Sequence, residues 1–136
     1  MRYDTKIAIV VRENLATWQK LNVASFLAGG LVAAAPELAG EPYQDGSGRF
    51  YGPLIRQPVL IFSATAEELR QVLQRAQGRG VRAHLYTNEL FSTGNDIANR
   101  AAVAGVATAA LDLVGLGLHA ERKEIDKITK GLKLHG

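Results

Sequence analysis

The chain has 136 residues, no cysteine, and 16 basic against 13 acidic side chains, which gives a formal net charge of +3. This length predicts a single domain that buries most of its apolar surface without help from disulfides or metals. The absence of thiols excludes disulfides, zinc–thiolate sites and a cysteine nucleophile, and it is compatible with a reducing cytoplasm, where we expect the protein. A mildly basic surface permits a polyanionic partner but does not require one.

The first third of the chain begins as a buried strand and continues as a long helix. The run of β-branched residues over 5–11 has no polar alternation, which predicts a strand covered on both faces at the centre of a sheet. Thr17 is a suitable N-cap for a helix over 18–34. Gly29 and Gly30 each cost this helix about 1 kcal/mol relative to alanine, so we expect another element to approach closely there.

The longest nearly uncharged run, 21–36, approaches the length of a membrane span. Asn22, Ser25 and the glycine pair interrupt it, and no basic segment typical of a signal peptide precedes it. We therefore expect a core helix and no association with a membrane.

The middle of the chain predicts a hairpin followed by a strand and a helix. Segment 36–56 has proline, glycine and aromatic residues around a glycine-rich turn, and we interpret it as a flap or hairpin insert. Gln57-Pro58 opens a second strand over 59–63. A capping box at Thr65–Glu68 then starts a helix that ends near Arg79.

A third strand over 81–86 completes a βαβ crossover, so we expect strands two and three to form a parallel pair. A loop and short-helix insert over 90–110 follows. The fourth strand, 112–118, has Val114, Leu116 and Leu118 on one face, and its glycines on the other leave a smooth surface for a helix. A last helix over 121–130 buries Ile125 and Ile128. The sequence thus predicts an α/β single domain over 1–136, with a four-stranded mixed sheet flanked by helices.

Lys20 is the most informative polar side chain near the end of the first strand. With Thr17 as N-cap it lies in the first helical turn, where the helix dipole disfavours a cation by about 0.3–1 kcal/mol. A lysine there, beside Arg12 and the free N–H groups of the helix start, forms an anion site for a phosphate or a developing oxyanion. The alternative is a surface lysine at an imperfect helix start.

Three further residues of this stretch are candidates for substrate contacts. Asn14 and Asn22 carry amides that orient a substrate, and Trp18 is able to stack on a base or to cover a pocket. The alternative for Trp18 is that it helps to pin the flap to the core.

The loop after the third strand is also rich in hydrogen-bonding groups. Thr87, Asn88 and Glu89 emerge at the same sheet edge as Arg12 and Lys20 if the strands are parallel. Glu89 is the only carboxylate in this neighbourhood able to act as a general base. The same residue types serve turns and helix caps, so a purely structural role is the alternative.

Other motifs carry little chemistry. Segment 115–120 matches the dinucleotide pattern G-x-G-x-x-A, but its glycines fall inside a strand and no acidic ribose ligand follows. His84, His119 and His135 lack metal-ligand spacing, so we predict no metal and no cofactor. No serine lies in the G-x-S-x-G motif of serine hydrolases.

Several segments, taken in order, resemble the type-two peptidyl-tRNA hydrolases. They are Lys6–Arg12 with Asn14-Leu15 and Lys20 before a small-residue helix, Gln57-Pro58 with Ala64–Leu69, and Ile125–Thr129 with Leu132–Leu134. More closely, the whole chain looks like a bacterial family of unknown function placed in that superfamily, through Thr17–Asn22 and Glu89–Gly94. The resemblance implies the same four-stranded mixed sheet and, in the hydrolases, an ester cleavage that releases peptide from tRNA without a metal.

The chain departs from the hydrolases around the site. They approach their lysine through glycines, where this chain has Trp18-Gln19 before Lys20, although Lys20 falls on the matching position. Small and apolar residues over 24–28 replace a glutamine and a histidine. Glu89 is the only substitute for an aspartate near the end of the third strand. The resemblance therefore implies the fold more strongly than the activity.

Two functions remain open. The first is a metal-independent hydrolase of an ester such as peptidyl-tRNA, in which Lys20 binds phosphate or stabilises the oxyanion. Glu89, or a water held by Thr87 and Asn88, then delivers the nucleophile. The second is a non-catalytic module that binds a small ligand or a protein on the same scaffold. The expected partners are tRNA or a small molecule, and the apolar surface of the flap and the alanine-rich insert favours a homodimer.

Overall fold

In the computed structural model, which describes residues 2–136, strand β1 (Thr5–Arg12) lies at the centre of a five-stranded sheet. Its neighbours are β6 (Leu113–Glu121) on one side and β4 (Val59–Ala64) on the other. Residues 7–11 are at most 1% exposed, which confirms the prediction of a strand covered on both faces.

The sheet is mixed, with the order β5-β6-β1-β4-β7. β1 and β4 run parallel, whereas β6 pairs antiparallel with both β1 and β5 (His84–Thr87). The second and third predicted strands, β4 and β5, run in the same direction as expected, but they do not pair with each other, because β1 and β6 lie between them. The sheet also has five strands rather than four, because residues after the last helix return as β7 (Lys133–Leu134) on the far side of β4.

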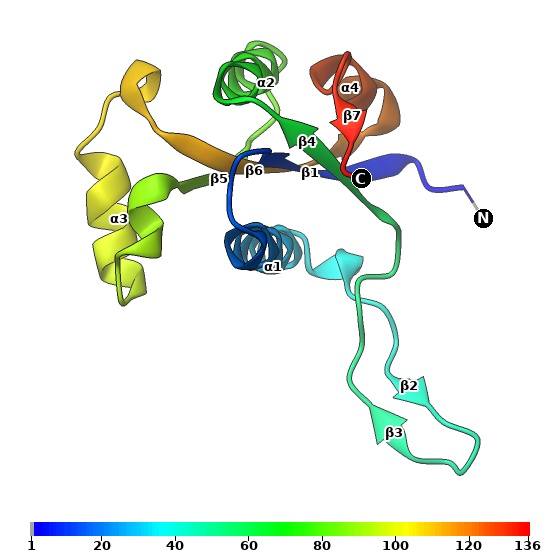
Figure 1. Ribbon diagram of the computed structural model, residues 1–136. Helices are drawn as coiled ribbons and strands as arrows, with labels where there is room; N and C mark the ends of the chain where they lie inside the picture. Colours follow the sequence, from blue (N-terminus) through cyan, green and yellow to red (C-terminus); the bar gives the residue numbers. More distant parts are fainter. Residues whose placement is uncertain (1) are drawn as a thin grey trace.

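Helices cover both faces of this sheet (Figure 1). α1 (Thr17–Ala34) lies on one face, and α2 (Ala66–Gly78) and α4 (Arg122–Ile128) lie on the other. The side chains of β1 point alternately to the two faces of the sheet, each of which has a hydrophobic core. Ile7, Ile9 and Val11 pack in the core under α1. Ala8 and Val10 pack in the core under α2 and α4. Among residues 2–136, no helix combines the length and the apolar character needed to cross a membrane.

The helix starts follow simple capping rules. Thr65 and Glu68 form the predicted capping box of α2, with the Thr65 Oγ1 accepting from the Glu68 N–H at 3.1 Å. The N-cap of α1 is Ala16 rather than Thr17. Alanine is tolerated there because the Gln19 Oε1 accepts a hydrogen bond from the Ala16 N–H at 3.0 Å.

The glycines of β6 allow α1 to lie directly on the strand, as the sequence predicted. A Cβ atom added at Gly115 would overlap the Val23 side chain and lie 3.1 Å from the Leu27 Cδ1. A Cβ added at Gly117 would lie 3.4 Å from Leu27 and Leu31. At Gly115 helix and strand are therefore closer than a larger residue allows, whereas at Gly117 an added Cβ would make ordinary contacts.

The face predicted for Val114 is wrong. Leu116 and Leu118 pack under α2 and α4, but Val114 packs with the cluster under α1. The pairing of β5 with β6 shifts register between Tyr86 and Thr87, and this irregularity turns Val114 to the opposite face.

Two segments stand away from the sheet. Segment 36–56 contains the short helix η1 (Pro36–Leu38) and a hairpin of β2 (Tyr43–Gln44) and β3 (Phe50–Tyr51), which extends from the body of the molecule (Figure 1). On the other side, η2 (Asn88–Phe91) leads to α3 (Asp96–Ala104) and η3 (Thr108–Ala110), and α3 buries none of its residues.

Asp45 holds the turn of the hairpin. Its carboxylate accepts hydrogen bonds from the backbone N–H groups of Ser47 and Arg49 and from the Tyr51 hydroxyl. These bonds, that from Tyr51 above all, lower the pKa of Asp45, because they stabilise the charged form.

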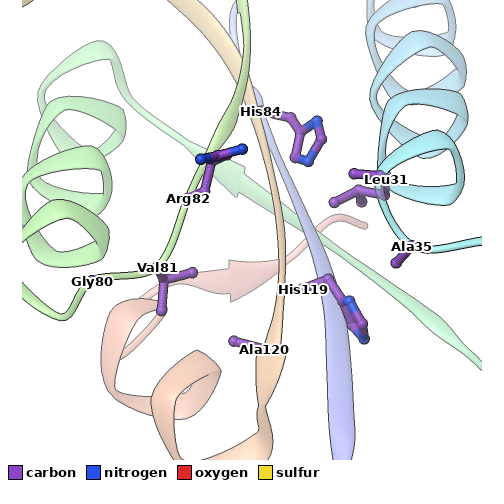
Figure 2. A pocket seen from close by; sticks show the side chains of 9 residues that line it. Leu31, Ala35, Gly80, Val81, Arg82, His84, His119 and Ala120 are labelled. Carbon is purple, nitrogen blue, oxygen red and sulfur yellow. The ribbon is translucent and has the colours of Figure 1, made fainter.

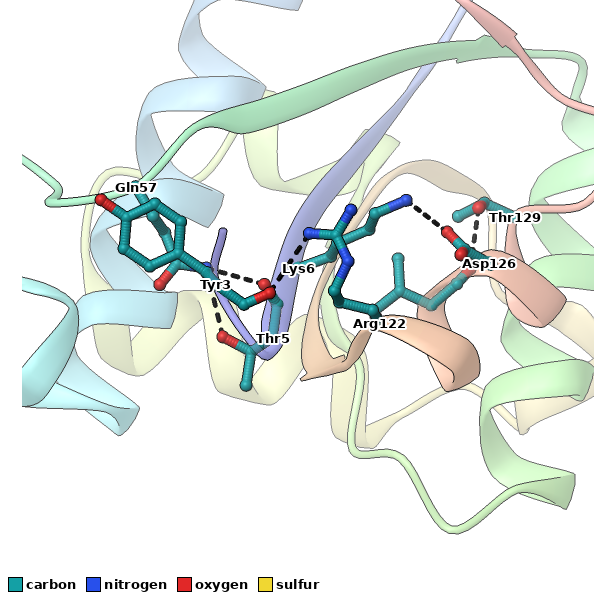
Figure 3. Close-up of polar contacts among 8 residues, drawn as sticks. Tyr3, Thr5, Lys6, Gln57, Arg122, Asp126 and Thr129 are labelled. Atoms are coloured by element: carbon teal, nitrogen blue, oxygen red, sulfur yellow. Dashed lines mark hydrogen bonds and ion pairs between the residues drawn. The ribbon is translucent and has the colours of Figure 1, made fainter. Parts of the chain in front are cut away.

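Polar contacts fasten the amino end of β1 (Figure 3). The Gln57 Nε2 donates to the Thr5 carbonyl and hydroxyl oxygens, both at 3.2 Å, and the Lys6 Nζ lies 2.5 Å from Asp126 of α4. This end of the strand is therefore occupied by structural contacts, and the predicted ligand edge is the opposite one.

We expect Gly115→Ala to lower the free energy of unfolding by about 1–3 kcal/mol, because the added methyl group overpacks the contact between β6 and α1. Urea denaturation measures this change. Gly29→Ala is the matched control, since nothing lies within 4 Å of a Cβ there and helix propensity favours alanine by about 1 kcal/mol. Equal effects of the two substitutions would contradict the close packing of α1 on β6.

Candidate functional site

Arg12, the last residue of β1, is held by three hydrogen bonds. Its Nε donates to the Asn14 Oδ1 at 3.0 Å, and its Nη1 donates to the Asp112 carboxylate at 2.7 Å and to the Leu113 carbonyl at 3.3 Å. The Asn88 N–H donates to the Asp112 carbonyl at 2.9 Å. The structure thus gathers Arg12, Asn14 and Asn88 around Asp112, which neutralises the guanidinium and links β1 to the start of β6.

Lys20 does not join this cluster, contrary to the expectation that it lies beside Arg12. By strand alternation Arg12 follows Ala8 and Val10 on the α2 side of the sheet, whereas Lys20 belongs to α1 on the other side. The two cations therefore do not form one shared anion site.

Lys20 instead meets His135, a residue that the sequence analysis set aside. The Lys20 Nζ lies 3.2 Å from the His135 Nε2, and the His135 Nδ1 lies 2.7 Å from the Gly136 carbonyl oxygen. Because an ammonium group only donates, the Nε2 accepts from Lys20 and the Nδ1 carries the hydrogen that Gly136 accepts. The pairing of β7 with β4 places His135 here, and its N–H donates to the Ile61 carbonyl at 2.8 Å.

A groove of about 340 Å³ lies beside this pair, between α1 and the β4–β7 edge. Its lining consists of Val11, Thr17, Lys20, Leu21, Ala24, Ile61 and His135. The residues are apolar except for Thr17 and the cation–imidazole pair, and none is a carboxylate.

The first turn of α1 adds to the positive character of the groove. It has no acidic residue, and Ala16 offers no side-chain acceptor to the free N–H groups. Thr17 and Lys20 of this turn both line the groove. The helix dipole and the ammonium group therefore favour an anion at the same place.

Trp18 lies against η2, not against the hairpin. Its side chain is 57% exposed, and its ring meets that of Phe91 edge to face with centroids 5.7 Å apart. The row of rings continues from Phe91 to Tyr86 at 5.1 Å and from Tyr86 to Phe26 at 5.8 Å. Neither Trp18 nor the hairpin lines the Lys20 groove.

The remaining predicted residues lie outside the groove. Thr87 ends β5 and is 2% exposed, and its hydroxyl has no hydrogen-bond partner among residues 2–136. Glu89 is exposed on η2, and Asn22 is exposed on α1. The structure therefore does not bring Glu89 or Thr87 to Lys20.

The sequence contained one signal for His135 that the analysis did not use. The apolar–polar alternation of Leu132, Lys133 and Leu134 is typical of a short strand, which would carry the residue after it to a sheet. Within the described part of the chain, no group of three histidine, cysteine or acidic side chains is placed to hold a metal ion.

Comparisons with known proteins agree with this fold. A solved structure of a protein of unknown function from Agrobacterium tumefaciens strain C58 is 47% identical to this chain, with a TM-score of 0.96 over 99% of this chain and 100% of that chain. No curated protein matches the chain. Neither comparison indicates a relation to the peptidyl-tRNA hydrolases. A family model described as "Protein of unknown function (DUF2000)" matches residues 5–136, and the chain therefore belongs to the DUF2000 family.

Proposed function

We propose that the protein is a small-ligand-binding module and that the Lys20 groove takes an anion with an apolar part. The observation that carries this proposal is the pair of Lys20 and His135 on a groove whose lining contains no acidic side chain. A carboxylate or phosphate meets the ammonium group, and Leu21, Ala24 and Ile61 cover the apolar part.

The charges at the groove favour such a ligand. The Lys20 ammonium has three hydrogens, and the contact with His135 uses one of them. A charge-assisted hydrogen bond contributes about 1.5–3 kcal/mol, and the amino end of a helix contributes about 0.3–1 kcal/mol for an anion. Both contributions favour a negatively charged group on the ligand.

Ester hydrolysis on the peptidyl-tRNA hydrolase scaffold is the second candidate. His135 favours it, because the Nε2 is free to accept a proton from water once the Lys20 ammonium turns from the imidazole to the oxyanion of the ester. In this proposal His135 takes the role that the sequence analysis gave to Glu89 and Thr87. A tRNA partner suits the net charge of +3, and a cytoplasmic location suits the lack of cysteine.

We expect Lys20→Ala to weaken the binding of N-acetyl-leucine, a carboxylate with an apolar part, by about 10- to 100-fold, because the variant loses a charge-assisted hydrogen bond. Isothermal titration calorimetry measures the affinity. Lys130→Ala removes the same charge from an exposed position after α4, and we expect it to leave the affinity unchanged. Equal losses in both variants would mean that only net charge matters and would contradict the site.

Incubation with peptidyl-tRNA at high protein concentration tests the second candidate. If the hydrolase proposal is correct, peptide is released, and both Lys20→Ala and His135→Asn reduce the rate by about 100-fold or more. Glu89→Gln is the control, and we expect it to keep the rate of the unaltered protein. Release that survives Lys20→Ala would contradict the assignment of the groove. If the unaltered protein releases no peptide, the hydrolase proposal is contradicted and the binding module is favoured.

We also propose that the protein forms a homodimer through the hairpin. Phe50 of β3 is 69% exposed and Leu54, which follows the hairpin, is 65% exposed, and a two-stranded hairpin is marginally stable on its own in water. We expect Phe50→Ser combined with Leu54→Ser to convert a dimer to a monomer in multi-angle light scattering. Ile97→Ser, at an equally exposed position of α3, should leave the mass unchanged. A monomeric unaltered protein would contradict this proposal.

A further inference from the structure

A second cavity, of about 560 Å³, lies between α1, β5 and α3, away from the β4–β7 edge that bounds the Lys20 groove. Its apolar walls come from Leu27, Leu85, Leu90 and Val103. Tyr86 and His84, two residues apart on β5, also line it. The volume falls in the range of small-molecule sites, about 300–1,000 Å³.

Tyr86 brings an unpartnered hydroxyl group to this cavity. The residue is 7% exposed, and its hydroxyl makes no hydrogen bond within residues 2–136. Burial raises the pKa of Tyr86, so the hydroxyl stays protonated at neutral pH and is able to donate. The hydroxyl is not one of the fully buried unpartnered atoms, so water reaches it in the free protein, and a ligand group that replaces this water is able to bond it.

His84 offers a second polar group on the same face of β5. Neither of its ring nitrogens makes a hydrogen bond within the described residues, and a Cβ added at Gly30 of α1 would lie 3.2 Å from its Nδ1. Figure 2, centred on the neighbouring cavity, shows the imidazole pointing toward α1. Burial, with a contribution from Arg82, lowers the pKa of His84, so the ring is neutral at pH 7 with one donor and one acceptor.

The outer wall of the cavity is loosely held and carries no net charge. α3 buries none of its residues, and its main contacts are with η2. Asp96 and Arg100 on its cavity side form an ion pair with each other, so their charges cancel. At the mouth, Phe26 of α1 is 60% exposed although its ring meets Tyr86 edge to face.

From these observations we propose that the cavity is a binding site for a small uncharged aromatic molecule with one polar group. The polar group bonds the Tyr86 hydroxyl, and the ring lies among the apolar walls against Phe26. An uncharged ligand fits because the walls are apolar and their two charges are already paired. The bound molecule gives α3 the buried contacts that it lacks, so binding orders this helix.

The test uses the full chain and 4-methylphenol as probe, with 4-methylbenzoate as its charged counterpart. Calorimetry gives the affinities, and amide resonances in nitrogen–proton NMR spectra locate the contact. We expect saturable binding of 4-methylphenol, with shifts at β5 and α3 and slower hydrogen exchange in α3. Binding of 4-methylbenzoate should be at least tenfold weaker, because a carboxylate loses its water in an apolar site.

Two variants and their controls locate the site. Tyr86→Phe keeps the ring and removes the hydroxyl, and we expect a loss of about 3- to 10-fold in affinity. Val103→Trp fills the cavity and should abolish binding, whereas Ile97→Trp places the same side chain at an exposed position of α3 and should not. Lys20→Ala should leave 4-methylphenol binding unchanged. The experiments therefore distinguish a failure of this proposal from a failure of the proposed function of the Lys20 groove.

The proposal is overturned if 4-methylphenol does not bind saturably, or if it binds equally to Val103→Trp. An unchanged affinity of Tyr86→Phe for 4-methylphenol would contradict a hydrogen bond between the Tyr86 hydroxyl and the ligand. Tighter binding of 4-methylbenzoate would show an anion site instead of an uncharged one. Because Tyr86→Phe is a conservative change, it tests the site even if Val103→Trp does not fold.

Discussion

The close contact of α1 with β6 determines where everything else on that face lies. Gly115 and Gly117 bring the helix onto the strand, and Val23, Leu27 and Leu31 then fill the space between them. A helix seated so deeply has two flanks, each facing a different part of the sheet. Lys20 and Leu21 lie on the flank near β4 and β7, and Phe26 lies on the flank near β5. The Lys20 groove and the cavity beside Tyr86 are the spaces left on the two sides of one helix.

Much of the fold could be predicted from local patterns. The uninterrupted apolar run of β1 indicates a central strand, Thr65–Glu68 form a capping box, and the turn around Asp45 indicates a hairpin. Strand order could not be predicted in this way, because a crossover pattern does not state which strands enter the gap between its two ends. β4 and β5 look like neighbours in the chain, yet β1 and β6 separate them in the sheet.

The candidate site was predictable to the same degree. Lys20 can be identified from the sequence because the helix dipole disfavours a cation in the first turn, and this depends only on neighbouring residues. Its partner His135 is 115 positions away and depends on the pairing of β7 with β4, which no local pattern contains. The separation of Arg12 from Lys20 also needs the structure, because the sequence of a strand buried on both faces does not show which residues lie under α1. Val11 is buried under α1, so the next residue of a regular strand faces the other way.

The register of the central strands also decides when the chain is able to fold. Thr5 pairs with Glu121 and Val11 with Gly115, so the middle of the sheet joins the two ends of the sequence. Closing so long a loop is slow, because chain entropy is lost before the contacts that compensate for it are made. On the ribosome, β1 therefore cannot complete its pairing with β6 until residue 121 has been made, and β4 is its only earlier partner strand among the described residues. Synthesis rate and chaperone access bear on this protein most strongly during that interval.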